Sequence, residues 1–340
     1  MCDFSKVKTV LALSAVLATL CSCTTTNSVT ELEDFAPTSQ RQFLAENTRM
    51  ELLWAAGKFS EGPTLDKEGA VLFTDIPNNR IMRYNPANGQ TTVWRENSGS
   101  ANGLKMTSAG VLLACEGADG GPRRVTATAP DGRVTVVADR IDGKRFNSPN
   151  DVDVAPNGDI YFTDPRYTGD EARELDFEGV FLVRGGTVSV ATPDLQRPNG
   201  ILISRDGKFA FIADNNHFTG GNRSLVRMDV QPDGSLSNAR TLFSFRDDQR
   251  GFDGMALDEA GNIYATAGLG AYAGIYVFSP EGEQLAFIDV PDNPTNCTFG
   301  GPSEPNTLYF TAQVITGNTS PLTMGLYRIK LEKKGHRLFP

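Results

Sequence analysis

Short apolar segments alternate with glycine-containing turns along most of the chain. The segments combine branched or aromatic residues with small ones, as in "VLFTD" (71–75), "IYFTD" (160–164) and "LYFTA" (308–312). Segments of this length that alternate or run apolar are typical of β-strands buried on one or both faces. No long stretch has the periodicity of an amphipathic helix. The pattern therefore predicts an all-β protein.

One unit recurs six times within this pattern. Each copy begins with an acidic or amide residue, passes through two short strands separated by a turn, and is followed by a further strand. The leading residues are spaced 41 to 54 residues apart, and they are Glu61, Asn102, Asn150, Asn199, Asp253 and Asn296. Repeats of about 40–50 residues with four short strands each are typical of propeller blades. We therefore predict one six-bladed β-propeller over residues 45–335, with residues 50–57 as the outer strand of the last blade.

The leading residues occupy equivalent positions, so the propeller would direct all six toward its central channel. Two carboxylates and four amides would then form a ring of oxygen donors. Ca²⁺ takes six to eight oxygen ligands and tolerates irregular geometry. The ring therefore predicts a metal-binding channel for Ca²⁺. Mg²⁺, Mn²⁺ and Zn²⁺ are alternatives, although a chain with only His217 and His336 as histidines disfavours zinc.

A simpler interpretation is that each Asn-Gly or Asp-Gly pair forms only a turn, as these dipeptides commonly do. Ordinary turns in this chain, such as those at 85–89 and 156–159, lie between strands. The leading residues instead stand at the head of the same strand in every copy. Their common position favours the ring.

The first residues have the features of an export signal. Lys6 and Lys8 precede an apolar run at 9–20 that is too short to span a membrane as a mature helix. The following "LCSC" (20–23) resembles a bacterial lipobox, in which Cys23 is lipidated. Processing at Cys21 or by ordinary signal peptidase is the alternative.

These features predict a lipoprotein signal peptide over residues 1–22 and a polar tether at 23–44. The expected location is the bacterial cell envelope, as a periplasm-facing lipoprotein or a secreted protein. The only expected membrane contact is the lipid anchor. At the other end, residues 336–340 are expected to form a surface tail.

The net charge of −9 and the lack of a basic run make nucleic acid an unexpected partner. We expect a monomer or weak oligomer that acts on a small molecule. Cys115 and Cys297 lie far apart in the repeats, which favours two buried free thiols. No Gly-x-Ser-x-Gly motif supports a serine-hydrolase mechanism.

Several motifs extend the pattern beyond the repeat. They are "SEGP" (60–63), "GKRFNSPNDV" (143–152), "IYFTDPRY" (160–167), "RPNGI" (197–201), "DGMALDEAGNIY" (253–264) and "NCTFGG" (296–301). Together they resemble the SMP-30/gluconolactonase/luciferin-regenerating-enzyme family of six-bladed propellers, over nearly the whole chain from about residue 50. "GKRFNSPND" followed by "YFTDP" resembles the bacterial gluconolactonase branch most.

This resemblance implies a single catalytic metal site, usually for calcium. The residues that match its ligands are Glu61, Asn150, Asn199 and Asp253. Asp253 also matches the general base, and Asn150 matches a position that serves substrate in some members. Asn102 and Asn296 would contact substrate or a bound water. The animal branch has an arginine where this chain has Ser148, so that substrate contact is either absent or supplied elsewhere, by Arg145, Arg166 or Arg197.

The leading hypothesis is a calcium-dependent lactonase that opens sugar lactones. The metal would polarise the lactone carbonyl and Asp253 would take a proton from the attacking water. The alternatives are an organophosphate or ester hydrolase of the same family and a non-catalytic carbohydrate-binding lipoprotein.

Other polar and aromatic residues have more than one interpretation. Asp151 is expected to support Asn150, and the loop residue His217 is either exposed or a substrate contact. Asp75 and Asp164, which end strands, are expected to cap turns. The aromatic loop residues either overhang the channel mouth or cover blade edges, and they are Tyr167, Phe218 and Tyr272.

Overall fold

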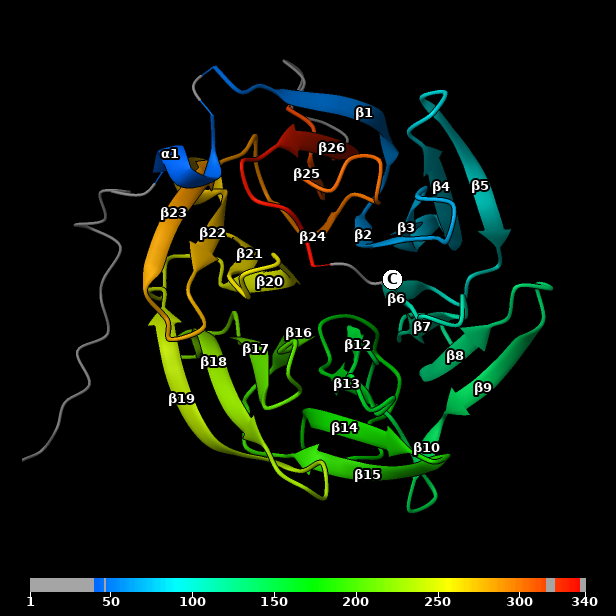
Figure 1. Cartoon of the computed structure of the whole chain (residues 1–340). Coiled ribbons are helices and arrows are strands. Elements are labelled where there is room, and N and C mark those ends of the chain that lie inside the picture. Colours follow the sequence, from blue (N-terminus) through cyan, green and yellow to red (C-terminus); the bar gives the residue numbers. More distant parts are fainter. Residues whose placement is uncertain (1–39, 46, 316–321, 337–340) are drawn as a thin grey trace, which may run out of the picture.

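The computed structural model describes residues 40–45, 47–315 and 322–336 of the 340-residue chain. Within these ranges, six four-stranded antiparallel sheets are arranged around a central axis (Figure 1). This arrangement confirms the all-β, six-bladed propeller.

The blades follow the chain order, each with its first strand innermost (Figure 1). Blade 1 consists of β2 (Ser60–Leu65), β3 (Val71–Asp75), β4 (Arg80–Asn85) and β5 (Gln90–Glu96). Blade 2 consists of β6 (Ala101–Met106), β7 (Leu112–Glu116), β8 (Arg124–Thr128) and β9 (Val134–Ala138). Blade 3 consists of β12 (Val152–Val154), β13 (Ile160–Asp164), β14 (Gly179–Arg184) and β15 (Thr187–Thr192). Blade 4 consists of β16 (Pro198–Ile203), β17 (Phe209–Asn215), β18 (Arg223–Val230) and β19 (Leu236–Ser244). Blade 5 consists of β20 (Phe252–Leu257), β21 (Ile263–Ala267), β22 (Gly274–Phe278) and β23 (Gln284–Asp289).

The last blade joins the two ends of the chain. Its strands are β24 (Asn296–Phe299), β25 (Thr307–Gln313), β26 (Met324–Lys330) and, outermost, β1 (Met50–Gly57). Met50 pairs with Ile329 and Gly57 with Met324. The prediction that residues 50–57 close the ring in this way is confirmed.

Each pair of neighbouring blades shares an apolar core, so the sheets are buried on both faces. Phe162 and Phe181 of blade 3, for example, pack with Phe146 and Leu113 against blade 2. Similar cores fill each of the other blade interfaces, including the junction of blades 6 and 1. This explains why the strand segments read as apolar runs. Cys115 and Cys297 are buried free thiols in two of these cores, as predicted.

A few short elements complete the fold. They are the hairpin β10 (Arg140–Ile141) and β11 (Lys144–Arg145), the helix α1 (Gln40–Phe43), and the 3₁₀ turns η2 (Ile76–Asn78) and η3 (Gly270–Tyr272). In the described part of the chain, no helix is long and apolar enough to cross a membrane.

Two expectations about the chain ends need correction. The range expected to be tether, 23–44, includes α1, and Phe43 is buried against Tyr264 of blade 5 with ring centroids 6.3 Å apart. His336, expected on the surface, is half-buried, and its backbone N–H donates to Leu257 O over 2.9 Å. Both segments therefore pack on the propeller, the first through the ring of Phe43 and the second through a backbone hydrogen bond. The signal segment and Cys23 lie outside the described residues.

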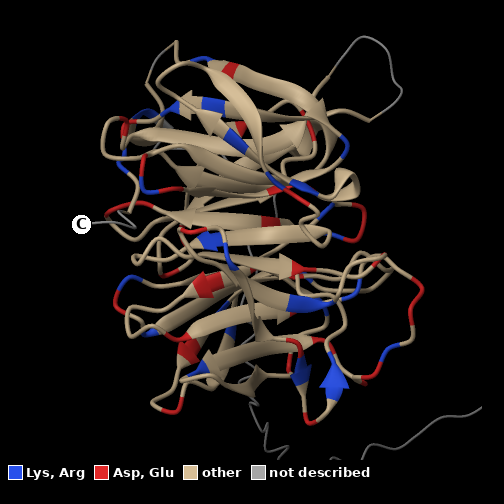
Figure 2. Cartoon of the chain, turned by 90° about the vertical axis from the view of Figure 1, so that its right-hand side faces the viewer, with Lys and Arg blue, Asp and Glu red and all other residues tan. Residues whose placement is uncertain are grey.

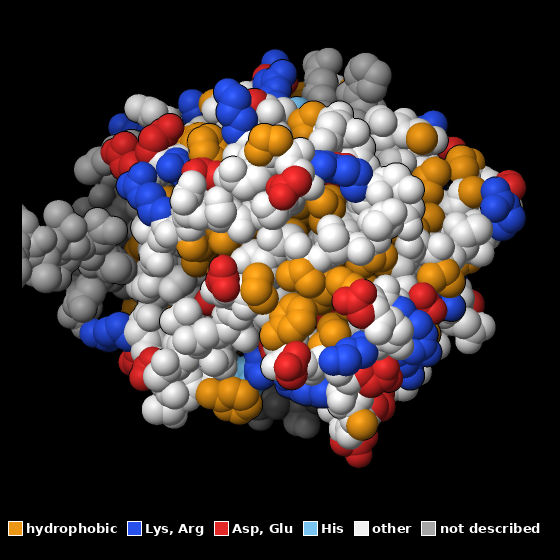
Figure 3. Space-filling view, turned by 90° about the horizontal axis from the view of Figure 1, so that it is seen from below, with side chains coloured by type: hydrophobic (Ala, Val, Ile, Leu, Met, Phe, Trp, Pro, Cys, Tyr) orange, Lys and Arg blue, Asp and Glu red, His pale blue; other side chains and the backbone are white. Residues whose placement is uncertain are grey.

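The surface carries both signs of charge. Lys and Arg alternate with Asp and Glu over the side shown in Figure 2. The side that carries β15 and β10 shows a group of apolar side chains among charged ones (Figure 3).

Candidate functional site

The six leading residues of the repeats lie at the same end of the inner strands. Glu61, Asn102, Asn199 and Asp253 are each the second residue of their strand, Asn296 is the first residue of β24, and Asn150 lies two residues before β12. The structure therefore brings the predicted positions to one end of the channel.

The glycines that follow several of these residues lie in the inner strands. The pairing register shifts directly after the leading residue in β2 and across the leading residue in β6, β16 and β20, which is the signature of a β-bulge. A Cβ on Gly254 would lie 1.8 Å from Cγ of Asn296, and one on Gly200 would lie 2.1 Å from the carbonyl oxygen of Asp253. The glycines thus allow neighbouring inner strands to approach closely. These Asn-Gly and Asp-Gly pairs build the ring and are not hairpin turns.

Glu61 and Asp253 form a buried pair of carboxyl groups. Each residue is 4% exposed, and each side chain lies near enough to affect the pKa of the other. Burial raises the pKa of Glu61 well above its usual range, and the negative charge of Asp253 raises that pKa further. Burial also raises the pKa of Asp253, against the opposing effects of Arg250 and Asn199. Two carboxylates in this position repel each other unless a proton or a cation lies between them.

Two amides complete this part of the ring. The side chain of Asn199 lies near enough to Asp253 to lower its pKa, and that of Asn296 lies near enough to Glu61 to lower its pKa. Asn296 Oδ1 also accepts the N–H of Cys297 over 2.8 Å. The structure therefore brings four predicted site residues, two acids and two amides, close together.

Asn102 and Asn150 are held by their backbones. The carbonyl of Asn102 accepts the Thr74 hydroxyl over 3.1 Å, and the carbonyl of Asn150 accepts the N–H of Gly103 over 2.7 Å. Within the described residues, neither side-chain amide has a hydrogen-bond partner. Both are therefore free to contact a ligand.

Arg250 is a site residue that the sequence analysis missed. Its Nη2 donates to Asp253 Oδ2, and its Nη1 donates to Pro294 O over 2.7 Å. The signal was present in "RGFDG" (250–254), where the arginine precedes the acid by three residues. It has no counterpart in the other repeats, so the repeat comparison could not find it.

The residues of the ring fit a hard divalent cation. Carboxylate and amide oxygens are the donors that Ca²⁺ prefers. A cation would also relieve the repulsion between Glu61 and Asp253, which Arg250 now relieves only at Asp253. The described residues contain no cluster of three or more His, Cys, Asp and Glu side chains suited to a metal. Amides must therefore supply part of any coordination here.

Asp151 has a different position from the one expected. Its carboxylate accepts the N–H groups of Val152 over 3.0 Å and Ile201 over 3.2 Å, so it joins β12 to β16. No hydrogen bond links it to the Asn150 side chain in the described structure. Its hydrogen bonds therefore fix the spacing of blades 3 and 4 beneath the ring. Burial raises the pKa of Asp151 to about 7.

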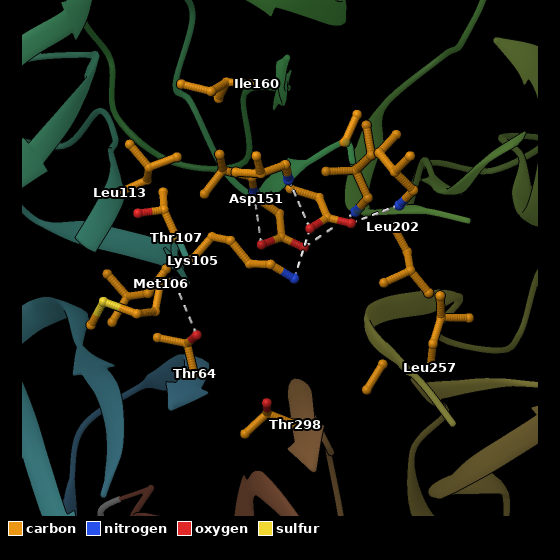
Figure 4. Close-up of a pocket in the computed structure, with 18 of the residues that line it drawn as sticks. Thr64, Lys105, Met106, Thr107, Leu113, Asp151, Ile160, Leu202, Leu257 and Thr298 are labelled. Atoms are coloured by element: carbon orange, nitrogen blue, oxygen red, sulfur yellow. Dashed lines mark hydrogen bonds and ion pairs between the residues drawn. The ribbon is translucent and has the colours of Figure 1, made fainter. Parts of the chain in front are cut away.

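Below the ring, the channel widens into a cavity of about 800 Å³ (Figure 4). Asp151 and Asn296 line its inner end, and His336 lies at its outer end. Lys105 extends into it and forms an ion pair with Asp153 over 2.7 Å (Figure 4). Most of the remaining cavity wall is apolar. The polar ring lies at the end of the channel opposite to His336.

Two acids that end strands have the capping role that was predicted. Asp75 accepts the N–H of Lys58 and two donors of Arg80. Asp164 accepts the N–H groups of Asn147 and Ser148, each over 2.7 Å. These contacts fix the connections that lead into the inner strands.

The three arginines proposed to replace the missing substrate contact are all engaged elsewhere. Arg145 donates to Pro122 O over 2.8 Å, Arg166 donates to Asn147 O, and Arg197 pairs with Glu178 over 3.0 Å. None of these partners belongs to the ring. A substrate role for Arg145 stays a prediction without structural support.

His217 lies in the loop between β17 and β18, at the same end of the blades as the ring. It is exposed and stacks on Tyr167, with ring centroids 5.9 Å apart. Partial burial and two nearby arginines lower its pKa, so the imidazole is neutral near neutral pH. Its role as a substrate contact remains a prediction.

Fold and site together define a class: a propeller whose channel carries a ring of two carboxylates and several amides. Residues 59–314 match the family model described as the SMP-30/gluconolactonase/LRE-like region. The chain belongs to this family.

Individual relatives agree with this assignment. The chain is 32% identical to a gluconolactonase of Zymomonas mobilis over 284 residues, which cover 75% of this chain and 76% of the relative. It is 26% identical to a regucalcin of Xenopus laevis, over 72% of this chain and 80% of the relative. Among solved structures, a putative gluconolactonase with 27% identity superposes with a TM-score of 0.73, covering 87% of this chain and 96% of that one.

Proposed function

We propose that the protein is a calcium-dependent lactonase that opens sugar lactones to the corresponding acids. The observation that carries the proposal is the buried contact of Glu61 with Asp253, flanked by the amides of Asn199 and Asn296. Membership of the family and the 32% identity to a protein named gluconolactonase support the reaction class.

Glu61, Asn150, Asn199 and Asp253 would hold the ion. When bound, calcium would supply a Lewis acid that polarises the lactone carbonyl. Mg²⁺, Mn²⁺ and Zn²⁺ are alternative ions for this site. Because all the donors are oxygen atoms, calcium is favoured over them.

The chain's own residues would perform the proton transfer. One oxygen of Asp253 would accept a proton from the water that attacks the carbonyl, while its other oxygen stays with Arg250 or the ion. Burial raises the pKa of Asp253, which strengthens it as a base, whereas Arg250 keeps the ionised form available. The free amides of Asn102 and Asn150 would donate to the hydroxyl or carbonyl oxygens of the substrate.

The test is hydrolysis of glucono-1,5-lactone followed with a pH indicator, after treatment with chelator and addition of single metal ions. We expect chelation to abolish turnover and Ca²⁺ to restore it. Asp253→Asn should lower kcat by about 10²–10⁴-fold, while Asp131→Asn on an exposed turn should have no effect. Turnover that survives chelation would overturn the metal mechanism, and wild-type turnover by Asp253→Asn would overturn the base assignment.

We also propose that Cys23 anchors the protein to the cell envelope, with the propeller facing the periplasm. The support is the sequence of the first 23 residues. Labelled palmitate should be incorporated into the wild-type chain and not into Cys23→Ser. Equal labelling of the two chains would contradict the proposal.

A further inference from the structure

Exposed apolar side chains lie on loops at the same end of the propeller as the ring. Phe218, in the β17–β18 loop, is 58% exposed, and Leu269, in the β21–β22 loop, is 48% exposed. Ile315 and Leu322 extend the set on the β25–β26 connection. The other large exposed apolar residues of the described chain lie on strands β1, β5 and β9 at the blade edges. The exposed apolar loop residues therefore lie at the end of the propeller that carries the ring, where a ligand of the ring could reach them.

Phe218 is placed close to the Asn199 side of the ring. Its ring lies over the guanidinium of Arg197, 4.9 Å from Cζ to the ring centroid. Arg197 directly precedes the Pro198–Asn199 segment that opens β16. Tyr167 covers the same guanidinium at 5.3 Å, and it lies near enough for the charge of Asp253 to affect its pKa.

Leu269 is placed close to the Asp253 side. The N–H of its neighbour Gly268 donates to Arg250 O over 3.2 Å. Arg250 itself holds the Asp253 carboxylate. Phe218 and Leu269 therefore flank the half of the ring that contains the proposed base.

The loop that carries Phe218 is tightly held. The guanidinium of Arg223, which is 4% exposed, donates to the carbonyls of His217 over 2.9 Å and Phe218 over 3.3 Å. The N–H of Gly221 donates to Phe218 O over 2.9 Å. An apolar ring held in place at 58% exposure is preorganised for contact, because little conformational freedom remains to be lost on binding.

The arginines next to Phe218 and Leu269 are already paired with carboxylates. Glu178 accepts both Arg197 and Arg173, over 3.0 and 2.7 Å, and Arg250 is paired with Asp253. Among the described residues, Arg197 and Arg250, the arginines closest to Phe218 and Leu269, are thus each already engaged with a carboxylate. A substituent that is apolar and uncharged matches this surface best.

We infer that the site takes lactones bearing an alkyl or aryl substituent, with Phe218 and Leu269 as specificity-determining contacts for that substituent. The inference rests on the proposed lactonase function. An aromatic ring alone would also suit a sugar face, but the aliphatic Leu269 on the neighbouring blade gains only from an apolar partner.

The experiment compares unsubstituted δ-valerolactone with δ-decalactone, which adds a pentyl chain to the same ring. For Phe218→Ser, we expect KM for δ-decalactone to rise about tenfold with kcat unchanged, because lost apolar burial weakens ground and transition state alike. KM for δ-valerolactone should stay within about twofold of wild type. Leu269→Ser should act in the same direction, and Phe218→Leu should restore most of the affinity.

Val136→Ser, at an equally exposed position on β9, is the matched control and should change neither substrate. Melting temperatures should show that each variant is folded. Equal effects of Phe218→Ser on both lactones, or no effect, would overturn the inference.

A separate binding measurement distinguishes failure of the inference from failure of the lactonase proposal. If the wild type opens no lactone, the proposed function is wrong. Calorimetry with δ-valerolactam and its pentyl-substituted analogue then decides the inference, since neither lactam needs to be hydrolysed. Tighter binding of the pentyl lactam by wild type, lost in Phe218→Ser, supports the apolar contact, and equal affinities overturn it.

Discussion

The Arg250 guanidinium donates to the carboxylate of Asp253, three residues later along the chain. This contact places a fixed positive charge on the residue that we propose as both metal ligand and base. A divalent cation bound as proposed would compete with Arg250 for one carboxylate oxygen. Arg250 lowers the pKa of Asp253 and so favours its ionised form, and it should lower the affinity of the proposed site for a metal.

Replacing Arg250 by Gln should therefore tighten calcium binding. Removal of a positive charge in contact with Asp253 should lower Kd by about three- to tenfold. Calorimetric titration of the chelator-treated protein measures this. Arg250→Lys retains the charge and should bind calcium as the wild type does. Equal affinities of the Gln and Lys variants would show that Arg250 acts only through its bond to Pro294 O.

Glu61→Gln should uncouple the protein's stability from calcium. A ligand that binds only the folded state at 100 times its Kd adds about 2.7 kcal/mol to the free energy of unfolding. The wild type should gain stability of this order, and Glu61→Gln should gain almost none. Without metal, the variant should be at least as stable as wild type, because the substitution removes the repulsion between Glu61 and Asp253.

Thermal unfolding with chelator and with calcium provides the measurement. Glu68→Gln, at an exposed glutamate on the β2–β3 turn, is the control and should keep the full calcium effect. A full calcium shift in Glu61→Gln would remove Glu61 from the ligand set.

The sequence predicted the blades and the ring because both recur. A pattern repeated six times fixes which strand is innermost, and the leading residue of each copy then follows from register. The strand at 50–57 was also predicted correctly, as the outer strand that closes the last blade.

Features that occur once were not predictable in this way. Arg250 has no repeat counterpart, and Phe43 is a single aromatic residue in a polar segment with no periodicity to mark it. The partners of Asp151 depend on how closely β12 approaches β16, which is a property of blade packing and not of local sequence. The reason for the Asn-Gly pairs, close contact between inner strands, also appears only in three dimensions.

Asp164→Asn should flatten the pH dependence of stability. Burial raises the pKa of Asp164 to about 7 in the folded protein, above the ordinary value of about 3.9 in an unfolded chain. The protonated form is thus favoured by folding, and its contribution is complete below about pH 4 and lost as the pH rises through about 7. The variant cannot titrate at this position, so this loss should be absent.

Urea unfolding of the chelator-treated protein from pH 4 to pH 8 measures the effect. Stability of the wild type relative to Asp164→Asn should fall by up to about 1.4 kcal/mol per pH unit across this window. Asp131→Asn at an exposed turn should run parallel to wild type. A constant difference between wild type and Asp164→Asn would show that Asp164 has the same pKa folded and unfolded.

Gly254→Ala tests whether close packing of the inner strands builds the ring. The added methyl would lie 1.8 Å from Cγ of Asn296, so β20 and β24 would have to separate or Asn296 would have to leave Glu61. We expect overpacking to cost about 1–3 kcal/mol of stability and calcium affinity to fall with it. Gly301→Ala, whose new Cβ would come no closer than 3.3 Å to another residue, is the matched control. If Gly254→Ala loses stability but binds calcium as tightly as wild type, Asn296 contributes to packing alone and the metal is held by the opposite side of the ring.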